Sequence, residues 1–353
     1  MLLGIETSCD ETAAAVVATT GDAVRPWAIR SNVVASQVAI HREWGGVVPE
    51  LASRQHVRDI CGVVERALGD AEVDWPALDG VAVTHGPGLV GSLLVGLAFA
   101  KAAAWAHGLP LIAVNHLAGH VESLWLAHGP LPLPAVVLVV SGGHTSLYLV
   151  PEPGAYHLLG RTRDDAAGEA YDKVAKLIGL GYPGGPIVDR LAATGDDSAV
   201  DLPLTRLTHR DRNAPHRDGR FDFSFSGVKT AVLRHVRGRE AALGVDRLPE
   251  AEIAGLCASF QRTVVQSLLA QTAEAARWSS ARSIGVAGGV SANSRLRQEL
   301  QALGQSLGVP VFVPPLALAT DNAAMIAAAG LRLAEAGRVA AADVNAVPSL
   351  ALG

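Results

Sequence analysis

One pattern, a strand followed by a polar turn and a second strand, occurs twice in the sequence and constrains the fold more than any other feature. It lies at residues 2–18 and again at residues 136–150. Short apolar or β-branched runs on both sides of a polar turn predict β-hairpins. A repeated hairpin predicts two related lobes. The runs are Leu2–Glu6 and Ala13–Ala18, then Val136–Val140 and Ser146–Val150.

Helical stretches alternate with strands in the remaining sequence, which predicts an α/β fold. A third strand, Ser283–Ala287, precedes a glycine turn and a helical pattern at Ser294–Leu303. Proline and glycine between residues 126 and 134 indicate a division there. We expect an N-terminal lobe at 1–130 and a C-terminal lobe at 131–353, with the last helical segment packing back on the N-terminal lobe. The other predicted helices are Pro49–Leu68, Ser92–Ala106 and Ala254–Ser279.

Composition favours a buried globular protein in a reducing compartment. Hydrophobic residues make up 49% and charged residues 18%, which excludes a disordered chain. The three cysteines lie far apart and form no CxxC, so neither a disulfide framework nor a zinc-thiolate site is expected. The longest apolar stretch, Leu89–Ala106, is interrupted by Lys101 and two glycines, so we expect a buried helix and not a membrane span. These features favour a cytoplasmic protein.

Charge is unevenly distributed along the chain. The net charge is −5, yet residues 206–239 contain nine Lys or Arg against three Asp, a local excess of six positive charges. Such a strip can attract a phosphate backbone, or it can be an ordinary solvated loop and helix face. The loop at residues 206–222 is long for a compact domain, and loops of this kind are often functional.

Two histidines and a distant aspartate form a candidate metal site. His116 and His120 are four positions apart, so on a helix both rings project from one face. Asp321 is the best third ligand, in the first turn of an alanine-rich helix that Thr320 would cap. Two imidazoles and one carboxylate suit catalytic Fe(II) or Zn(II). An isolated histidine pair can also be two unrelated residues near a helix end, and Asp321 can simply favour the helix dipole.

A metallopeptidase is the first alternative for such a pair. The zincin motif is HExxH, in which the glutamate is the general base. Leu117 occupies that position here, and Glu122 would point away from the same helix face. The sequence therefore weakens the peptidase interpretation.

Glycine-rich turns after the strands are candidate nucleotide loops. In Ser141-Gly142-Gly143-His144-Thr145, glycines would let backbone amides approach an anion, although an ordinary hairpin turn has the same composition. Asn293, after Gly288-Gly289, could bind a base or ribose, and Asp172 and Asp189 could bind ribose hydroxyls or be surface acids. Asp10 and Glu11 could orient a water, a metal or a nucleophile, or they could form and cap the turn. His85-Gly86-Pro87-Gly88 could be an anion site or a tight turn.

Several long blocks, in order along residues 2 to about 330, resemble the tRNA adenosine threonylcarbamoyltransferases of the bacterial and organellar type. Many motifs in one order are more specific than any one alone. The blocks include Gly4-Ile5-Glu6-Thr7-Ser8-Cys9-Asp10-Glu11-Thr12, Asn115-His116-Leu117-Ala118-Gly119-His120, Val140-Ser141-Gly142-Gly143-His144-Thr145, Tyr182-Pro183-Gly184-Gly185-Pro186, Phe223-Ser224-Phe225-Ser226-Gly227 and Gly288-Gly289-Val290.

The resemblance implies two ribonuclease-H-like lobes of the actin, heat-shock-chaperone and sugar-kinase architecture, with a nucleotide cleft. It implies a divalent metal, Fe(II) or alternatively Zn(II), on His116, His120 and Asp321. It implies threonylcarbamoyl-AMP as donor and tRNA as acceptor, with Glu11 or Asp10 assisting proton removal. It further implies a shorter paralogous subunit of the TsaB type and a small ATPase of the TsaE type. Adenylate contacts are expected from Val140, Ser141, Gly142, Gly143, His144, Asp172, Gly185, Asp189 and Asn293.

Two other classes remain open on the sequence. A small-molecule kinase of the same fold would have similar phosphate loops but would not need the His116, His120 and Asp321 set. A nucleotide-sensing chaperone or scaffold would bind ATP without metal-dependent transfer.

Overall fold

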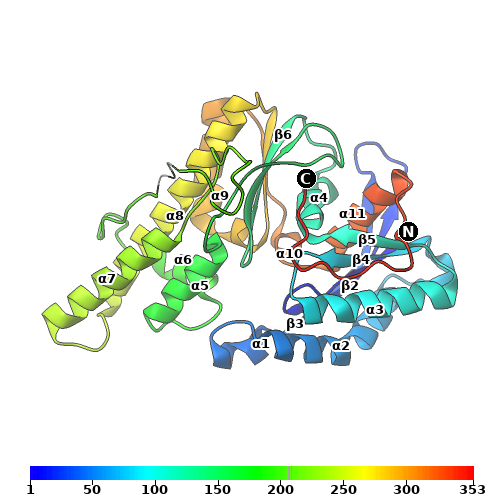
Figure 1. The fold of residues 1–353 in the computed structure, drawn as a ribbon, viewed down its shortest axis with the longest axis horizontal. Helices are drawn as coiled ribbons and strands as arrows, with labels where there is room; N and C mark the ends of the chain where they lie inside the picture. The colour runs from blue at the N-terminus through cyan, green and yellow to red at the C-terminus, as the bar shows by residue number, and fades with distance from the viewer. Residues whose placement is uncertain (206, 208) are drawn as a thin grey trace. The chain divides into compact units, whose positions relative to one another are not determined.

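The chain forms two compact units, coloured by residue number in Figure 1. The computed structural model describes residues 1–205, 207 and 209–353. Met1–Leu131 and Pro314–Gly353 make the first unit, and Pro132–Val313 make the second unit. The chain thus passes into the second unit after Leu131, inside the predicted boundary region, and its last forty residues are part of the first unit.

The first unit is built on a five-stranded sheet of order β3-β2-β1-β4-β5. β1, β2 and β3 are antiparallel neighbours, whereas β4 and β5 run parallel to β1. The predicted first hairpin is confirmed, because Glu6 of β1 pairs with Ala13 of β2. The strands are β1 Leu2–Glu6, β2 Glu11–Thr19, β3 Trp27–Ser36, β4 Gly80–Gly86 and β5 Leu111–Asn115.

The second unit repeats this topology with the order β8-β7-β6-β9-β10. β6 pairs antiparallel with β7 and parallel with β9, as β1 does with β2 and β4. The predicted second hairpin, the related lobes and the α/β class are therefore confirmed. The strands are β6 Ala135–Val140, β7 Thr145–Val150, β8 His157–Arg161, β9 Ser283–Ala287 and β10 Val311–Phe312.

Alternation along β1 assigns its side chains to two different layers of the first unit. Leu3 and Ile5 join the apolar core with α2 and α3. Gly4 is on the other face, where a side chain would meet Ala323 and Ala327 of α11. Figure 1 shows α2 and α3 on one side of this sheet and α4 and α11 on the other. The helices are α1 Val38–His41, α2 Pro49–Asp70, α3 Val90–His107, α4 His116–His128, α10 Leu316–Ala319 and α11 Ala323–Glu335, with 3-10 turns at Arg42–Trp44 and Trp75–Ala77.

An apolar core of the second unit is formed by its sheet and a long helix. Val136, Leu138 and Val140 of β6 belong to this core with Leu256 and Phe260 of α8. α8 also packs on α6 and α9. The helices are α5 Ala167–Leu177, α6 Gly184–Ala192, α7 Ser226–Leu243, α8 Glu250–Trp278 and α9 Ser294–Leu307, with a 3-10 turn at Gly289–Ala292.

Helix α3 is less buried than the sequence predicts. Its buried side chains, such as Leu93, Leu97 and Ala100, form one stripe, and the same helix leaves Leu94 46% and Trp105 89% exposed. By length and composition alone it could also cross a membrane, which is weak evidence since core helices pass the same test. The expectation of a buried helix therefore holds for one face of α3 only, because only that face packs within the first unit.

The C-terminal segment covers the His85–Gly88 turn. Val347 N donates to His85 O over 2.8 Å, and Gly88 N donates to Pro348 O over 3.1 Å. A side chain at Gly86 would overlap Val347 O. Because the Gly88 amide is bonded to the chain's own tail, this turn is a packed connection and not an anion site.

We expect Gly4→Ala to destabilise the protein by about 1–3 kcal/mol or more, because the added methyl overlaps α11 backbone and packed layers resist overfilling. Its Cβ would lie 2.4 Å from Ala323 O and 2.8 Å from Ala327 N. Urea unfolding measures the change. Gly62→Ala is the matched control: it lies inside α2 with nothing within 4 Å, so it should stabilise by up to about 1 kcal/mol. Equal stabilities of the two variants would contradict the packing described.

Candidate metal centre and nucleotide loops

Helix α4 carries both histidines at its beginning. Asn115 caps the helix, its Oδ1 accepting from Leu117 N over 2.9 Å and from Ala118 N over 3.4 Å. His116 is the first helical residue, and His120 follows one turn later. Their ring centroids lie 4.7 Å apart with the rings nearly perpendicular. The i, i+4 spacing thus places both imidazoles together, as expected.

Asp321 reaches these rings from a position that the sequence analysis assigned wrongly. It was expected in the first turn of a helix capped by Thr320, but α11 begins at Ala323 and its cap is Asn322, whose Oδ1 accepts from Met325 N over 3.1 Å. The physical reason is that the Asn322 amide satisfies the helix end. Asp321 therefore lies just outside the helix and is not needed as a cap.

The three side chains converge on a small volume. Asp321 Oδ1 lies 3.6 Å from His116 Nε2 and 3.1 Å from His120 Nε2. One ligand atom from each residue lies within 4.8 Å of the others. Metal–ligand bonds of about 2.1 Å place neighbouring ligand atoms roughly 3.0–3.4 Å apart. The 3.1 Å separation lies in this range and the 3.6 Å separation slightly above it, so small side-chain shifts would let the three residues share one ion.

The buried nitrogens of His120 support a metal ion at this place. The side chain is fully buried, yet neither ring nitrogen makes a hydrogen bond within the described part of the chain. The 3.1 Å approach of Nε2 to Asp321 lacks hydrogen-bond geometry. Buried polar atoms are nearly always satisfied, and an ion is one way to satisfy them. The residues therefore fit a divalent cation.

Glu6, which the sequence analysis did not select, contacts His116 from the opposite side. Its side chain is 1% exposed. It accepts from Ser8 N, from Thr84 Oγ1 over 2.7 Å and from His116 Nδ1 over 2.9 Å. The sequence feature that could have indicated Glu6 is an acid at the end of the apolar run of β1. Such an acid is expected to be buried, and a buried carboxylate needs partners. Burial acts to raise the pKa of Glu6, but the charge and hydrogen bond of His116 lower it below its ordinary value.

The surroundings of His116 raise the pKa of its imidazole. Burial acts to lower its pKa, but Asp321 and Glu6 raise the pKa to about 9. Without a cation, the raised pKa of His116 favours an imidazolium, which offsets one of the two neighbouring negative charges. A metal ion would replace a proton here.

Glu122 forms an ion pair with Arg332. It is fully buried and lies 2.9 Å from Arg332 Nη2 of α11. It is therefore paired elsewhere, as expected from its position, and it is not available as a peptidase base.

Asp10 and Glu11 form a second acidic group in the first unit. Burial raises the pKa of Glu11 well above its ordinary range, and the charges of Asp10 and Asp321 and a hydrogen bond to Asp10 raise it further. Glu11 Oε1 also lies 3.4 Å from Ser36 Oγ. A raised pKa makes the ionised form of a carboxyl group a stronger base.

The first glycine loop of the second unit closes on itself and on helix α5. Ser141 N donates to His144 O over 2.8 Å, and His144 N donates to Ser141 Oγ over 3.2 Å. A side chain at Gly142 or Gly143 would meet no described atom within 4 Å. Val140, by contrast, is fully buried, so only its backbone can face a ligand. The loop presents open backbone to its surroundings.

The other predicted adenylate residues of the second unit are linked by hydrogen bonds. Asp172 Oδ1 accepts from Gly184 N over 2.7 Å, which fixes the turn before Gly185. Asp189 accepts from Asn293 Nδ2 over 3.1 Å and from Ser294 Oγ over 2.7 Å. The Asn293 amide also donates to Gln261 and caps α9 through Leu296 N. Asn293 thus holds the start of α9, while a side chain at Gly185 would meet no described atom within 4 Å.

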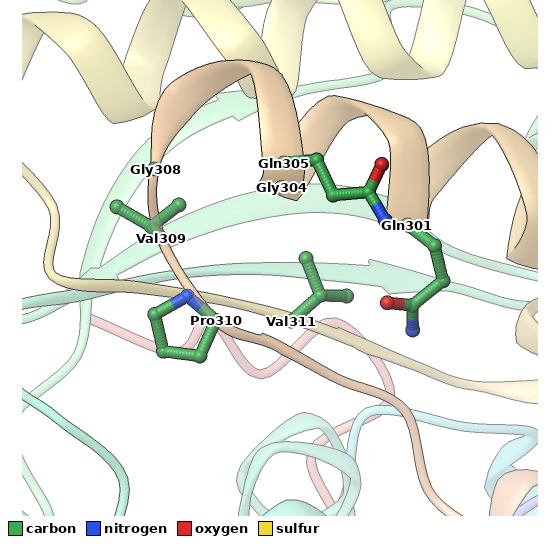
Figure 2. Close-up of a pocket in the computed structure, with 7 residues that line it drawn as sticks. All are labelled: Gln301, Gly304, Gln305, Gly308, Val309, Pro310 and Val311. Carbon is green, nitrogen blue, oxygen red and sulfur yellow. The ribbon is translucent and has the colours of Figure 1, made fainter.

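The second unit also contains a shallow pocket of about 270 Å³ at the end of α9, shown in Figure 2. Two glutamines, glycines, a proline and two valines line it, among them Gln301, Gln305 and Val311. None of these side chains is titratable or nucleophilic, and none is a predicted site residue. This pocket is not the candidate site.

A family model described as tRNA N6-adenosine threonylcarbamoyltransferase matches residues 28–328. The chain belongs to this family. Proteins of that name are 51% identical in Symbiobacterium thermophilum, over 100% of this chain and 97% of the relative, and 50% identical in Salinibacter ruber, over 100% of both. The Koribacter versatilis relative is 47% identical over 100% of this chain and 99% of its own length.

Membership makes the chain an acyltransferase of tRNA processing that modifies the N6 amine of an adenosine. These matches do not favour the peptidase, kinase or scaffold alternatives.

Two solved structures show the fold family. The activator of the 2-hydroxyisocaproyl-CoA dehydratase from Clostridium difficile, with bound ADPNP, gives a TM-score of 0.50 at 12% identity over 95% of both chains. Full-length HypF in the phosphate- and nucleotide-bound form gives 0.56 at 14% identity over 95% of this chain and 46% of that one. The expected actin-like architecture of ribonuclease-H-like lobes is confirmed.

We expect Asp189→Ala to cost about 1–3 kcal/mol, because it removes the acceptor of one Asn293 amide hydrogen and of Ser294 N at the start of α9. Denaturant unfolding measures the loss. Asp197→Ala is the control: Asp197 is 41% exposed and forms a surface ion pair with Arg295, worth less than about 1 kcal/mol. A loss at Asp197 as large as that at Asp189 would contradict the proposed network.

Proposed function

We propose that this chain transfers the threonylcarbamoyl group from threonylcarbamoyl-AMP to the adenosine 3′ of the anticodon, in tRNAs that read codons beginning with A. The observation that carries the proposal is the convergence of His116, His120 and Asp321 in a member of this family. The amine nitrogen forms a bond to the carbamoyl carbon, the bond from that carbon to the phosphate oxygen breaks, and AMP leaves with the bonding electrons.

His116, His120 and Asp321 would hold one divalent ion, Fe(II) or alternatively Zn(II), which suit two imidazoles and one carboxylate. When bound, such an ion supplies Lewis-acid polarisation of the carbonyl. An exocyclic aromatic amine is a weak nucleophile, so the acceptor carbon needs that activation.

The second unit would bind the AMP part of the donor. The open backbone at Gly142, Gly143 and Gly185 lets amides approach phosphate or ribose closely. Val140, Ser141 and His144 complete the first loop. Asp172, Asp189 and Asn293 keep the neighbouring turns in place, and an exposed part of either carboxylate can accept from ribose hydroxyls.

Glu11 is the proposed proton acceptor, with Asp10 as its partner. Burial and the charge of Asp10 raise the pKa of Glu11, so the ionised Glu11 carboxylate is a stronger base and can take the proton that the attacking amine loses.

Contact with tRNA would come from a subset of the basic strip. Arg206 lies outside the described residues. Four other members are paired internally: Arg217 with Asp222, Arg220 with Glu274, Lys229 with Asp165, and Arg239 with Glu252. Arg220 is exposed although it is ion-paired, and the other exposed members are Arg210, Arg212, Arg234 and Arg237. We propose these four as the phosphate contacts.

Partner subunits are also part of the proposal. The exposed apolar residues Val57 of α2 and Leu94 and Trp105 of α3 support docking of a shorter paralogous subunit on this side of the first unit. A small ATPase would complete the system, and all components would work in the cytoplasm.

We expect His120→Ala to lose the bound metal and to lower the transfer rate at least about 100-fold, because several kcal/mol of transition-state stabilisation are removed. Metal analysis and transfer from purified threonylcarbamoyl-AMP to unmodified tRNA measure the two effects. His107→Ala, which removes a ring stacked on Trp75, is the control and should keep both. Full activity of His120→Ala after chelation would refute the metal proposal.

Charge reversal at Arg210 and Arg212 should weaken tRNA binding and reduce the slope of log K against log salt by roughly 1–2, because each phosphate contact contributes slightly less than one. Filter binding over a salt series measures the slope. Reversal of the exposed Arg58 and Arg66 on α2 changes the net charge equally and should leave the slope nearly unchanged. Identical slopes for the two double variants would exclude these arginines as contacts.

A further inference from the structure

We infer that Glu6 is a positioning residue that keeps the proton of His116 on Nδ1 and thereby presents Nε2 to the metal. This inference depends on the metal site of the proposed function. It assigns a role to a buried carboxylate that does not touch the substrate. Carboxylates that accept from the far nitrogen of a histidine ligand fix its tautomer and orientation.

Two groups lie within hydrogen-bond distance of His116 Nδ1, Glu6 Oε2 at 2.9 Å and Ser8 Oγ at 3.2 Å, and of these only an ionised Glu6 is limited to accepting. Oε1 accepts from the Ser8 backbone amide, which can only donate. Oε2 lies 2.7 Å from Thr84 Oγ1 and 2.9 Å from His116 Nδ1. An ionised carboxylate has no proton to give, so Nδ1 must be the donor. Nε2 is then the nitrogen that faces Asp321, 3.6 Å away.

The strand geometry explains why a glutamate can reach this place. Glu6 follows Gly4 by two positions on β1, so its side chain is on the face that packs on α4 and α11. β4 runs parallel beside β1 with Ile5 opposite Val83, which brings Thr84 to the level of Glu6. The carboxylate is thus fixed by two strands and a turn before it meets the histidine.

Glu6→Gln should reverse the tautomer of His116. The Ser8 amide requires an oxygen at the Oε1 position, so the new NH₂ group must occupy the Oε2 position and donate to Nδ1. The ring proton then moves to Nε2, where it competes directly with the metal. We expect Co(II) affinity to fall about 10- to 100-fold, as for other carboxylates behind a histidine ligand.

The experiment titrates the full-length, chelator-stripped protein with Co(II) and follows the visible absorption of the bound ion. Glu122→Gln is the matched control, since Glu122 is an equally buried glutamate on α4 whose partner is Arg332. It should lose stability but keep Co(II) affinity within about threefold. Equal affinities of Glu6→Gln and the wild type, or equal losses in both variants, would overturn the inference.

A second measurement needs no variant and covers the case in which Glu6→Gln does not fold. Nitrogen-15 spectra of histidine-labelled wild-type protein with Zn(II) should show His116 protonated at Nδ1 and metal-bound at Nε2. Metal bound at Nδ1 would overturn the inference. If the wild type binds no ion, or if His120→Ala binds Co(II) as tightly as the wild type, the metal site itself fails, which is a distinguishable result.

Discussion

The close packing of α11 on β1 at Gly4 is the contact on which the rest of the first unit depends. A strand with any side chain at this position could not approach Ala323 and Ala327 so closely. Because α11 lies there, the residues before it bring Asp321 to the rings of α4. The Gly4 contact itself has no chemical function. It nevertheless places the Asp321 carboxylate beside two histidines that lie more than 200 positions earlier in the sequence.

The two units have the same strand order and contribute different chemistry. In the first unit the turn after β1 and the beginning of α4 carry acids and imidazoles, with Glu6, His116 and Asp321 in one chain of contacts. In the second unit the equivalent turn after β6 carries glycines with open backbone. Duplication of one topology therefore places acids and imidazoles in one unit and open glycine backbone in the other.

Much of the fold could be predicted because its strands are short apolar runs with polar turns on both sides. Ser283–Ala287 was predicted with the bounds that the structure has, since glycines end it sharply. Strands β4 and β5 were not predicted, because short parallel strands between helices have no alternating pattern. The histidine pair could be predicted from its spacing, whereas the role of Thr320 could not, because Asn322 caps equally well.

Other parts of the site depend on contacts that one sequence does not show. Glu6 is an ordinary acid in the sequence, and only its distance from His116 indicates a role. The basic strip has six excess charges in the sequence, but Arg217 and Lys229 belong to internal ion pairs. The C-terminal segment has no periodic pattern, yet Val347 and Pro348 bond to the turn after β4.

X-ray absorption spectroscopy of the metal-loaded protein tests the central claim most directly. If one ion is bound by His116, His120 and Asp321, the spectrum should show scattering from two imidazole nitrogens and one carboxylate oxygen at about 2.0–2.2 Å. Both imidazole signals should weaken together when His116 and His120 are replaced. A spectrum without imidazole scattering, or one that the double replacement leaves unchanged, would contradict the account.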